Sequence, residues 1–193
     1  GSLSAASAST DASGRASVTL TTSTKVDPAK ITKVKVSYPG LTSVTVSVVT
    51  KPGALAALKV EASPDTIEAV AGTVSVIKAT LIDANGNTRL EDGVTVSFGL
   101  SGPISFVGLS SVDTVDGVAE TTVQATASAR AGMTATARAT ASGKTGSATI
   151  RFISGAVTTV ILTISPASLD LGGTAEVTAK AEDPNHNPIA NAN

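Results

Sequence analysis

The chain has 193 residues, of which 41% are hydrophobic but only 2% aromatic, so a folded core has to be built from Val, Ile, Leu and Ala. A net charge of -1 provides no basic field for a nucleic acid and no polybasic segment for a membrane surface. The absence of cysteine excludes a disulfide framework, a thiolate nucleophile and a cysteine metal site.

Most of the chain alternates apolar and polar residues with a period of two, and no window of helical length carries an apolar stripe. The class predicted is therefore all-β. Strands are expected at 55–62, 74–83, 94–100, 117–127, 134–142 and 145–153, with short pieces near 66–69 and 104–109.

Two of these runs illustrate the pattern. Residues 134–142 place Ala135, Ala137, Ala139 and Ala141 on one face, which is predicted to point inward, and Thr or Arg on the other. Residues 31–38 likewise place Val34, Val36 and Tyr38 on one face and lysines on the other. Ser142-Gly143-Lys144 and Pro39-Gly40 are predicted hairpin turns, because each separates two alternating runs.

The sequence repeats itself with a period of roughly 100 residues, the usual size of an immunoglobulin-like sandwich. Residues 54–93 return as residues 156–193, and the Asp-Gly element at residues 10–16 returns at residues 113–119. The predicted architecture is tandem immunoglobulin-like β-sandwiches, with a complete unit at 54–153 flanked by the C-terminal part of a unit at 1–50 and the N-terminal part of another at 156–193. This phase suggests an excerpt of a longer protein, and the connections of two to four residues indicate a semi-rigid string.

Four motifs carry a resemblance to a known family. They are Ser63-Pro64 (repeated at Ser165-Pro166), Gly72-Thr73 (repeated at Gly173-Thr174), the Asp-x-Asn-x-Asn turns at 83–87 and 183–187, and the Asp-x-x-Gly-x-Ala element at 11–16, with Thr114 in place of Asp at 114–119. The chain resembles the bacterial immunoglobulin-like repeat of intimin and invasin type adhesins, the group 1 bacterial Ig-like domain. The resemblance implies an immunoglobulin-like sandwich, a stalk function and a location on the bacterial cell surface or outside the cell. No segment resembling a tip module is recognised, and neither a signal peptide nor an apolar run long enough for a membrane span is seen.

Asp83, Asn85 and Asn87 are the candidates for a metal site, because oxygen-bearing side chains at alternate positions suit Ca²⁺. The helix-loop-helix calcium motif needs a Gly after the third ligand and a closing Glu, whereas Gly86 precedes Asn87 here. Asx turns between strands are the favoured interpretation, and calcium binding is the weaker alternative. No other metal and no cofactor is predicted.

The sequence offers no catalytic residues, so an enzyme is not expected. Gly143-Lys144-Thr145 ends like a phosphate-binding loop but lacks the first Gly and falls in a predicted hairpin. His186 is the single histidine and lies in a turn, and no Gly-x-Ser-x-Gly elbow occurs. The carboxylates of Glu91, Asp92, Asp113, Asp116 and Glu120 are predicted to be turn and surface groups.

The leading functional hypothesis is therefore a non-catalytic structural spacer whose partners are the neighbouring repeats of the same protein. One alternative is a module that binds a carbohydrate or a protein receptor, for which Tyr38 is the single exposed aromatic candidate. Another is head-to-tail assembly, in which the C-terminal strands of one copy complete the N-terminal fragment of the next copy. No nucleic acid partner is expected.

Overall fold

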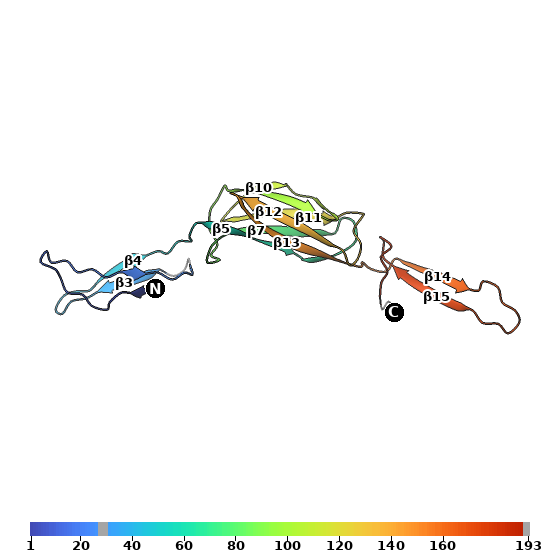
Figure 1. Cartoon of the computed structure of the whole chain (residues 1–193), viewed down its shortest axis with the longest axis horizontal. Coiled ribbons are helices and arrows are strands. Elements are labelled where there is room, and N and C mark those ends of the chain that lie inside the picture. Colours follow the sequence, from blue (N-terminus) through green and yellow to red (C-terminus); the bar gives the residue numbers. More distant parts are fainter. Residues whose placement is uncertain (27–30, 191–193) are drawn as a thin grey trace. The chain divides into compact units, whose positions relative to one another are not determined.

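The computed structural model describes residues 1–26 and 31–190 (Figure 1). The described residues contain strands and turns but no helix, which confirms the all-β class, and so none of them forms a helix able to cross a membrane. They divide into two compact units, residues 1–56 with 82–89 and residues 57–81 with 90–193. Residues 27–30 of the first predicted repeat and residues 191–193 of the last lie outside the described residues. The predicted repeat boundaries stay a prediction.

A β-sandwich occupies the middle of the chain, and its first layer is a four-stranded antiparallel sheet. The strand order is β5 (Leu55–Ser63), β7 (Val74–Asp83), β11 (Val118–Ala125) and β9 (Ile104–Phe106). In this sheet Ile77 lies opposite Thr121, and Val123 lies opposite Phe106.

The second layer is a five-stranded sheet. Its order is β10 (Ser111–Asp113), β8 (Thr95–Ser101), β12 (Thr134–Ala141), β13 (Lys144–Ile153) and β6 (Thr66–Glu68). All pairs are antiparallel except β13 with β6, which is parallel. The first strand is thus divided between the two sheets, with β5 in one, β6 in the other and a cis peptide bond at Ser63-Pro64 between them. This arrangement is an immunoglobulin-like sandwich.

The core of the sandwich is filled by small aliphatic side chains, as the alternation predicts. Ala135, Ala137, Ala139 and Ala141 on β12 are at most 3% exposed. The largest fully buried apolar side chains are Ile77, Leu81, Val96, Val123 and Ile150. Each of these contributes about 1.5–3 kcal/mol relative to an exposed position. Two aromatic side chains join them in the core, Phe98 at 6% and Phe152 at 2% exposed.

The two sheets approach closely where β13 crosses β5. A Cβ atom added at Gly146 would lie 2.2 Å from the carbonyl oxygen of Leu58 and 2.8 Å from the side chain of Val60. A side chain at this position would therefore force the two strands apart.

The predicted hairpin between β12 and β13 is confirmed. Ser142 and Gly143 have φ values of 47° and 72°, as a two-residue turn with two left-handed residues requires. Gly143-Lys144-Thr145 therefore belongs to a strand-to-strand turn and not to the strand-to-helix turn of a phosphate-binding loop.

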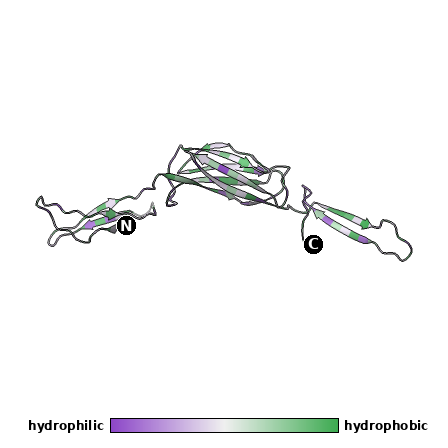
Figure 2. Cartoon of the chain, viewed as in Figure 1, coloured by the Kyte–Doolittle hydropathy of each residue, from purple (hydrophilic) through white to green (hydrophobic). Residues whose placement is uncertain are grey.

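The first unit contains two further sheets. β1 (Ser2–Leu3) pairs with β2 (Leu20–Thr21), and β3 (Thr32–Val36) pairs with β4 (Val44–Val48), both antiparallel. Gly40 takes a φ of 80° in the turn before β4. Beyond the sandwich, the second unit contains the hairpin of β14 (Thr159–Ser165) and β15 (Glu176–Glu182). Figure 2 shows that these short sheets carry apolar positions as the sandwich strands do.

Candidate functional site

The two Asp-x-Asn-x-Asn segments form the same backbone turn. In the first aspartate turn (residues 83–87), the Asp83 N–H donates to the Asn87 carbonyl at 3.0 Å and the Gly86 N–H donates to the Asp83 carbonyl at 3.0 Å. In the second aspartate turn (residues 183–187), the corresponding distances are 3.1 and 3.0 Å. Gly86 has a φ of 75° and His186 a φ of 59°, so the fourth residue is left-handed in both turns.

The carboxylate of Asp83 accepts four hydrogen bonds. Its Oδ1 accepts from the backbone N–H groups of Asn85 at 2.8 Å and Asn87 at 2.9 Å. Its Oδ2 accepts from the Gly53 N–H and from the Asn87 side-chain amide, both at 2.8 Å. The aspartate therefore closes its own turn and also holds the segment that precedes β5.

Asp183 repeats this network bond for bond. Oδ1 accepts from the N–H groups of Asn185 at 2.9 Å and Asn187 at 2.8 Å. Oδ2 accepts from the Gly155 N–H at 2.9 Å and from the Asn187 side chain at 2.8 Å. Asp83 and Asp183 are 4% and 1% exposed, so both networks are shielded from water.

These hydrogen bonds keep both aspartates ionised. The bond from the Asn87 side chain, followed by that from the Gly53 N–H, holds the pKa of Asp83 far below its ordinary value against the opposing effect of burial. For Asp183, burial is the largest single influence and raises the pKa, but the donors from Gly155 and Asn187 together outweigh it and the pKa lies below its ordinary value. Each turn therefore carries a shielded negative charge that is stabilised by N–H groups.

The last asparagine of each turn also forms hydrogen bonds with backbone groups that are distant in sequence. Asn87 donates through Nδ2 to the Thr24 carbonyl at 2.9 Å and accepts through Oδ1 from the Val26 N–H at 3.0 Å. Asn187 accepts from the Ala131 N–H at 2.9 Å, and its Nδ2 lies 3.4 Å from the Ala69 carbonyl, to which Asn185 also donates. In each turn the last asparagine thus connects the aspartate to a loop that is distant in sequence.

The calcium candidates Asp83, Asn85 and Asn87 lie together in the first turn, but N–H donors occupy both carboxylate oxygens of Asp83. A cation would have to displace those donors. Among the described residues, no group of three or more His, Asp or Glu side chains is arranged to hold a metal ion. The geometry favours the Asx-turn interpretation, and calcium binding stays an untested prediction.

The second turn carries an ion-pair cluster that the first turn does not share. The residues of the cluster are replaced at the first turn by Thr80, Ile82 and Gly86. Glu182 is 4% exposed and contacts Lys180 Nζ at 2.7 Å and His186 Nδ1 at 3.0 Å. Lys180 and then His186 lower the pKa of Glu182. Because the two basic side chains are 56% and 81% exposed, their contribution to stability is small.

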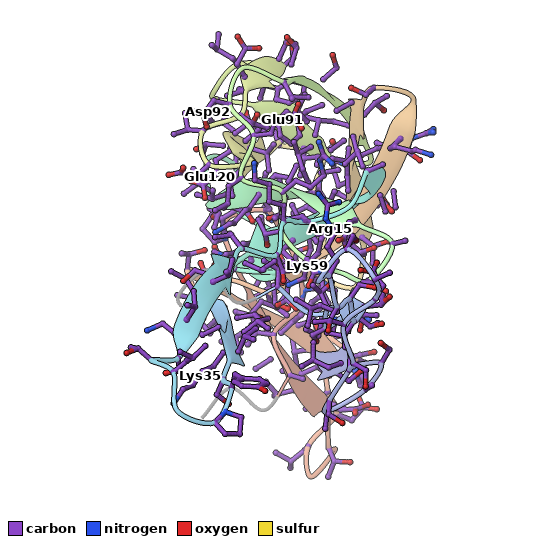
Figure 3. All side chains as sticks on the ribbon, turned by 90° about the vertical axis from the view of Figure 1, so that its left-hand side faces the viewer. Arg15, Lys35, Lys59, Glu91, Asp92 and Glu120 are labelled. Carbon is purple, nitrogen blue, oxygen red and sulfur yellow. The ribbon has the colours of Figure 1, made fainter. Side chains whose placement is uncertain are left out.

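The other residues considered from the sequence lie at the surface. Glu91, Asp92, Asp113, Asp116 and Glu120 are all exposed, and Figure 3 shows three of them. Tyr38 is 71% exposed. It borders a hollow of about 390 Å³ in the first unit, together with Leu3, Val34 and Val36.

The sequence predicts the two turns but not the hydrogen bonds that they form with residues distant in sequence. It assigned Asp83 and Asn87 to a local connection, whereas their side chains hold Gly53 and the loop at Thr24. A signal was present in the sequence, because a glycine precedes each aspartate at a similar distance, Gly53 before Asp83 and Gly155 before Asp183.

The described residues contain an immunoglobulin-like β-sandwich and two aspartate turns with the same hydrogen bonds. No protein-family model matches the chain, and the comparison with curated proteins finds no match. Similarities are found among solved structures. The chain is similar to the Escherichia coli adhesin FdeC, with 20% identity over 83% of this chain and 53% of that chain and a TM-score of 0.49.

Two further structures show the same kind of similarity. The D00-D0 domain of intimin is 18% identical over 58% of this chain and 55% of that chain, with a TM-score of 0.42. A family 2 glycosyl hydrolase of Bacteroides cellulosilyticus is 19% identical over 62% of this chain but only 18% of that chain, with a TM-score of 0.48. The chain spans less than a fifth of that hydrolase and about half of the adhesin structures. At these identities the likeness concerns the fold alone and carries no functional residue onto this chain.

Proposed function

We propose that the chain is a non-catalytic stalk segment of a bacterial surface or secreted adhesin-like protein, in which the repeats act as a stiff spacer. One observation carries the proposal. The same aspartate-centred network occurs twice, close to both predicted boundaries between repeats, and holds a glycine and a distant loop through shielded hydrogen bonds.

This repetition favours a mechanical role over a chemical one. A catalytic constellation has to occur once, whereas a constraint on repeat geometry has to recur at every junction. The likeness to FdeC and intimin agrees with this class of protein and with a location outside the cell, and both remain part of the proposal.

The stiffness of the second junction can be measured with paired spin labels. The chain contains no cysteine, so labels at Thr149→Cys on β13 and Thr178→Cys on β15, both exposed, report one distance without background labelling. A spacer predicts a single narrow distance distribution that broadens in Asn187→Ala. The matched control is Pro184→Ala, which changes the same turn without removing a side-chain hydrogen bond.

A broad distribution in the unmodified turn would reject the stiff junction. Melting of each labelled variant by circular dichroism confirms that the sandwich remains folded. Small-angle scattering adds an independent test, because a stiff string of repeats scatters as an elongated particle and a compact particle contradicts the proposal.

The alternative of a binding module makes a different prediction. A glycan or receptor bound by the full chain and lost in Tyr38→Ala would favour that alternative, because Tyr38 is an exposed aromatic anchor beside a hollow.

A further inference from the structure

The two aspartate turns share one backbone conformation but differ in the residue that follows the middle asparagine. In the first aspartate turn Asn85 is followed by Gly86, and in the second Asn185 is followed by His186. An asparagine loses its amide when the backbone nitrogen of the next residue attacks its side-chain carbonyl carbon. A next residue without a Cβ atom leaves that approach open. The first turn therefore contains the less hindered of the two asparagines.

The side chain of Asn185 is held by a hydrogen bond that Asn85 lacks. Asn185 is half-buried and donates through Nδ2 to the Ala69 carbonyl at 2.5 Å. Asn85 is exposed, and its bonds to other described residues come from its backbone, whose N–H donates to Asp83 and whose carbonyl accepts from Lys25. Turning the side chain toward the next nitrogen therefore breaks a hydrogen bond in the second turn and none in the first.

A lysine contacts the peptide group that would react in the first turn. Lys25 Nζ donates to the Asn85 carbonyl, and a Cβ atom added at Gly86 would lie 3.8 Å from the same Nζ. The Gly86 nitrogen must lose its proton to attack, and resonance places much of the resulting negative charge on the Asn85 carbonyl oxygen. The ammonium group therefore stabilises the nucleophile. Near the second turn, Arg130 donates instead to carbonyls of its own loop.

We propose that Asn85 is a site of spontaneous deamidation that Lys25 promotes, and that Asn185 is protected from the same reaction. The Gly86 nitrogen forms a bond to Asn85 Cγ while the Cγ–Nδ2 bond breaks. The amide group leaves as ammonia and carries away the proton that the Gly86 nitrogen has lost. Water then opens the five-membered succinimide at one of its two carbonyls, which gives aspartate or isoaspartate. The inference does not depend on the stalk proposal.

One hydrogen bond opposes the reaction in both turns. The Gly86 N–H donates to the Asp83 carbonyl and the His186 N–H donates to the Asp183 carbonyl, each at 3.0 Å. This bond has to open before the nitrogen can attack, so it slows both turns and favours neither. The difference between the turns comes from the glycine, the free side chain and the lysine.

Isoaspartate at residue 85 would alter the network around Asp83. Its main chain contains one more carbon atom, placed between the N–H groups of residues 85 and 87. Asp83 Oδ1 accepts from both of these groups, at 2.8 and 2.9 Å. The lengthened backbone disturbs this pair of bonds, and the same carboxylate also accepts from the Gly53 N–H. The amide resonance of Gly53 is therefore expected to move as isoaspartate accumulates.

Incubation of the folded full chain in warm, mildly alkaline buffer, followed by peptide mapping with mass spectrometry, tests the proposal. Conversion to aspartate and isoaspartate is expected at Asn85. Asn185 in the same molecule is the internal control and is expected to keep its amide over the same time. Hydroxylamine is expected to cleave the chain between Asn85 and Gly86, because it attacks the succinimide.

Variants separate the three features. Lys25→Ala is expected to slow conversion about fivefold, the size of a charge contact through water, and Lys25→Arg is expected to restore most of the rate. Gly86→His copies the second turn and is expected to stop conversion at Asn85. The matched His186→Gly is expected to leave Asn185 slower than Asn85, because Ala69 still holds its side chain. Circular dichroism confirms that each variant is folded.

The proposal is overturned if Asn85 keeps its amide in the folded chain under conditions that convert it in urea, or if Asn185 reacts as fast as Asn85. An unchanged rate in Lys25→Ala overturns the role of the lysine. So does an equal slowing of Lys25→Ala in urea, because the contact between Lys25 and the Asn85 carbonyl exists only in the folded chain.

Discussion

β7 and β15 are two versions of the same strand in different surroundings. Both end in the same aspartate turn with the same hydrogen bonds. Yet Ile77 on β7 is fully buried, whereas Val177 at the equivalent place on β15 is 63% exposed. The local pattern therefore determines the strand and the turn, and the opposite sheet determines whether the strand has a core.

The largest expected difference between the two strands is in unfolding free energy. Ile77→Ala should lower the stability of the sandwich by about 2–5 kcal/mol, because it leaves a cavity in a packed core. Val177→Ala should change it by less than about 0.5 kcal/mol, because the side chain lies at the surface. Urea unfolding followed by circular dichroism at low protein concentration measures both, and equal losses would show that the two strands are equally packed.

A substitution at Gly146 tests the close contact between the two sheets of the sandwich. The sheet of β14 and β15 has no such contact with a second sheet among the described residues. Gly146→Ala should cost about 1–3 kcal/mol, because the added methyl group meets the carbonyl of Leu58 on β5. Gly99→Ala on β8 is the matched control, since a Cβ atom there has no neighbour within 4 Å. A tolerated Gly146→Ala would mean that β5 and β13 can separate without loss of packing.

The two aspartate turns should respond alike to acid. The pKa values of Asp83 and Asp183 are lowered on folding from an unfolded value of about 3.9, so their contribution to stability is complete above about pH 4. That contribution is lost as the pH falls further, through the folded pKa values. The amide resonances of Gly53 and Gly155 should therefore stay constant from neutral pH to about pH 4 and move only below it.

Asp183→Asn is the control for this titration, because an amide does not titrate. It should remove the acid response of Gly155 and leave that of Gly53 unchanged. A response of Gly155 near neutral pH would contradict the assigned network.

The smallest expected effect is that of calcium. Both carboxylate oxygens of Asp83 already accept N–H donors. Millimolar calcium should therefore leave the melting temperature unchanged. A rise in the midpoint that is lost in Asp83→Asn would establish the calcium site instead.

The sequence predicted most of the sandwich because its strands carry a clear local signal. The alanines of β12 alternate over a full strand, and Ser142-Gly143 supplies the turn. β10 was not predicted, since Ser111–Asp113 is too short to show alternation and becomes a strand by pairing with β8.

For the candidate site, the sequence predicts the local contacts but not the contacts between residues that are distant in sequence. The spacing of Asp83, Asn85 and Asn87 predicts an Asx turn, because those contacts lie within a few residues. The bonds from Gly53 to Asp83 and from Asn87 to Thr24 join residues that are distant in sequence, so they depend on the packing of the folded repeats. For the same reason the alternation predicts that Val36 and Val177 share a face with apolar neighbours but not what covers that face.

The parallel pairing of β6 with β13 sets how the sandwich would respond to a pull on its two ends. These strands lie near the two ends of the sandwich sequence, and Arg151, Phe152 and Ile153 pair with Thr66, Ile67 and Glu68. A pull on the chain ends draws two parallel neighbours in opposite directions along their length. The hydrogen bonds between them would then be loaded together in shear rather than opened one after another.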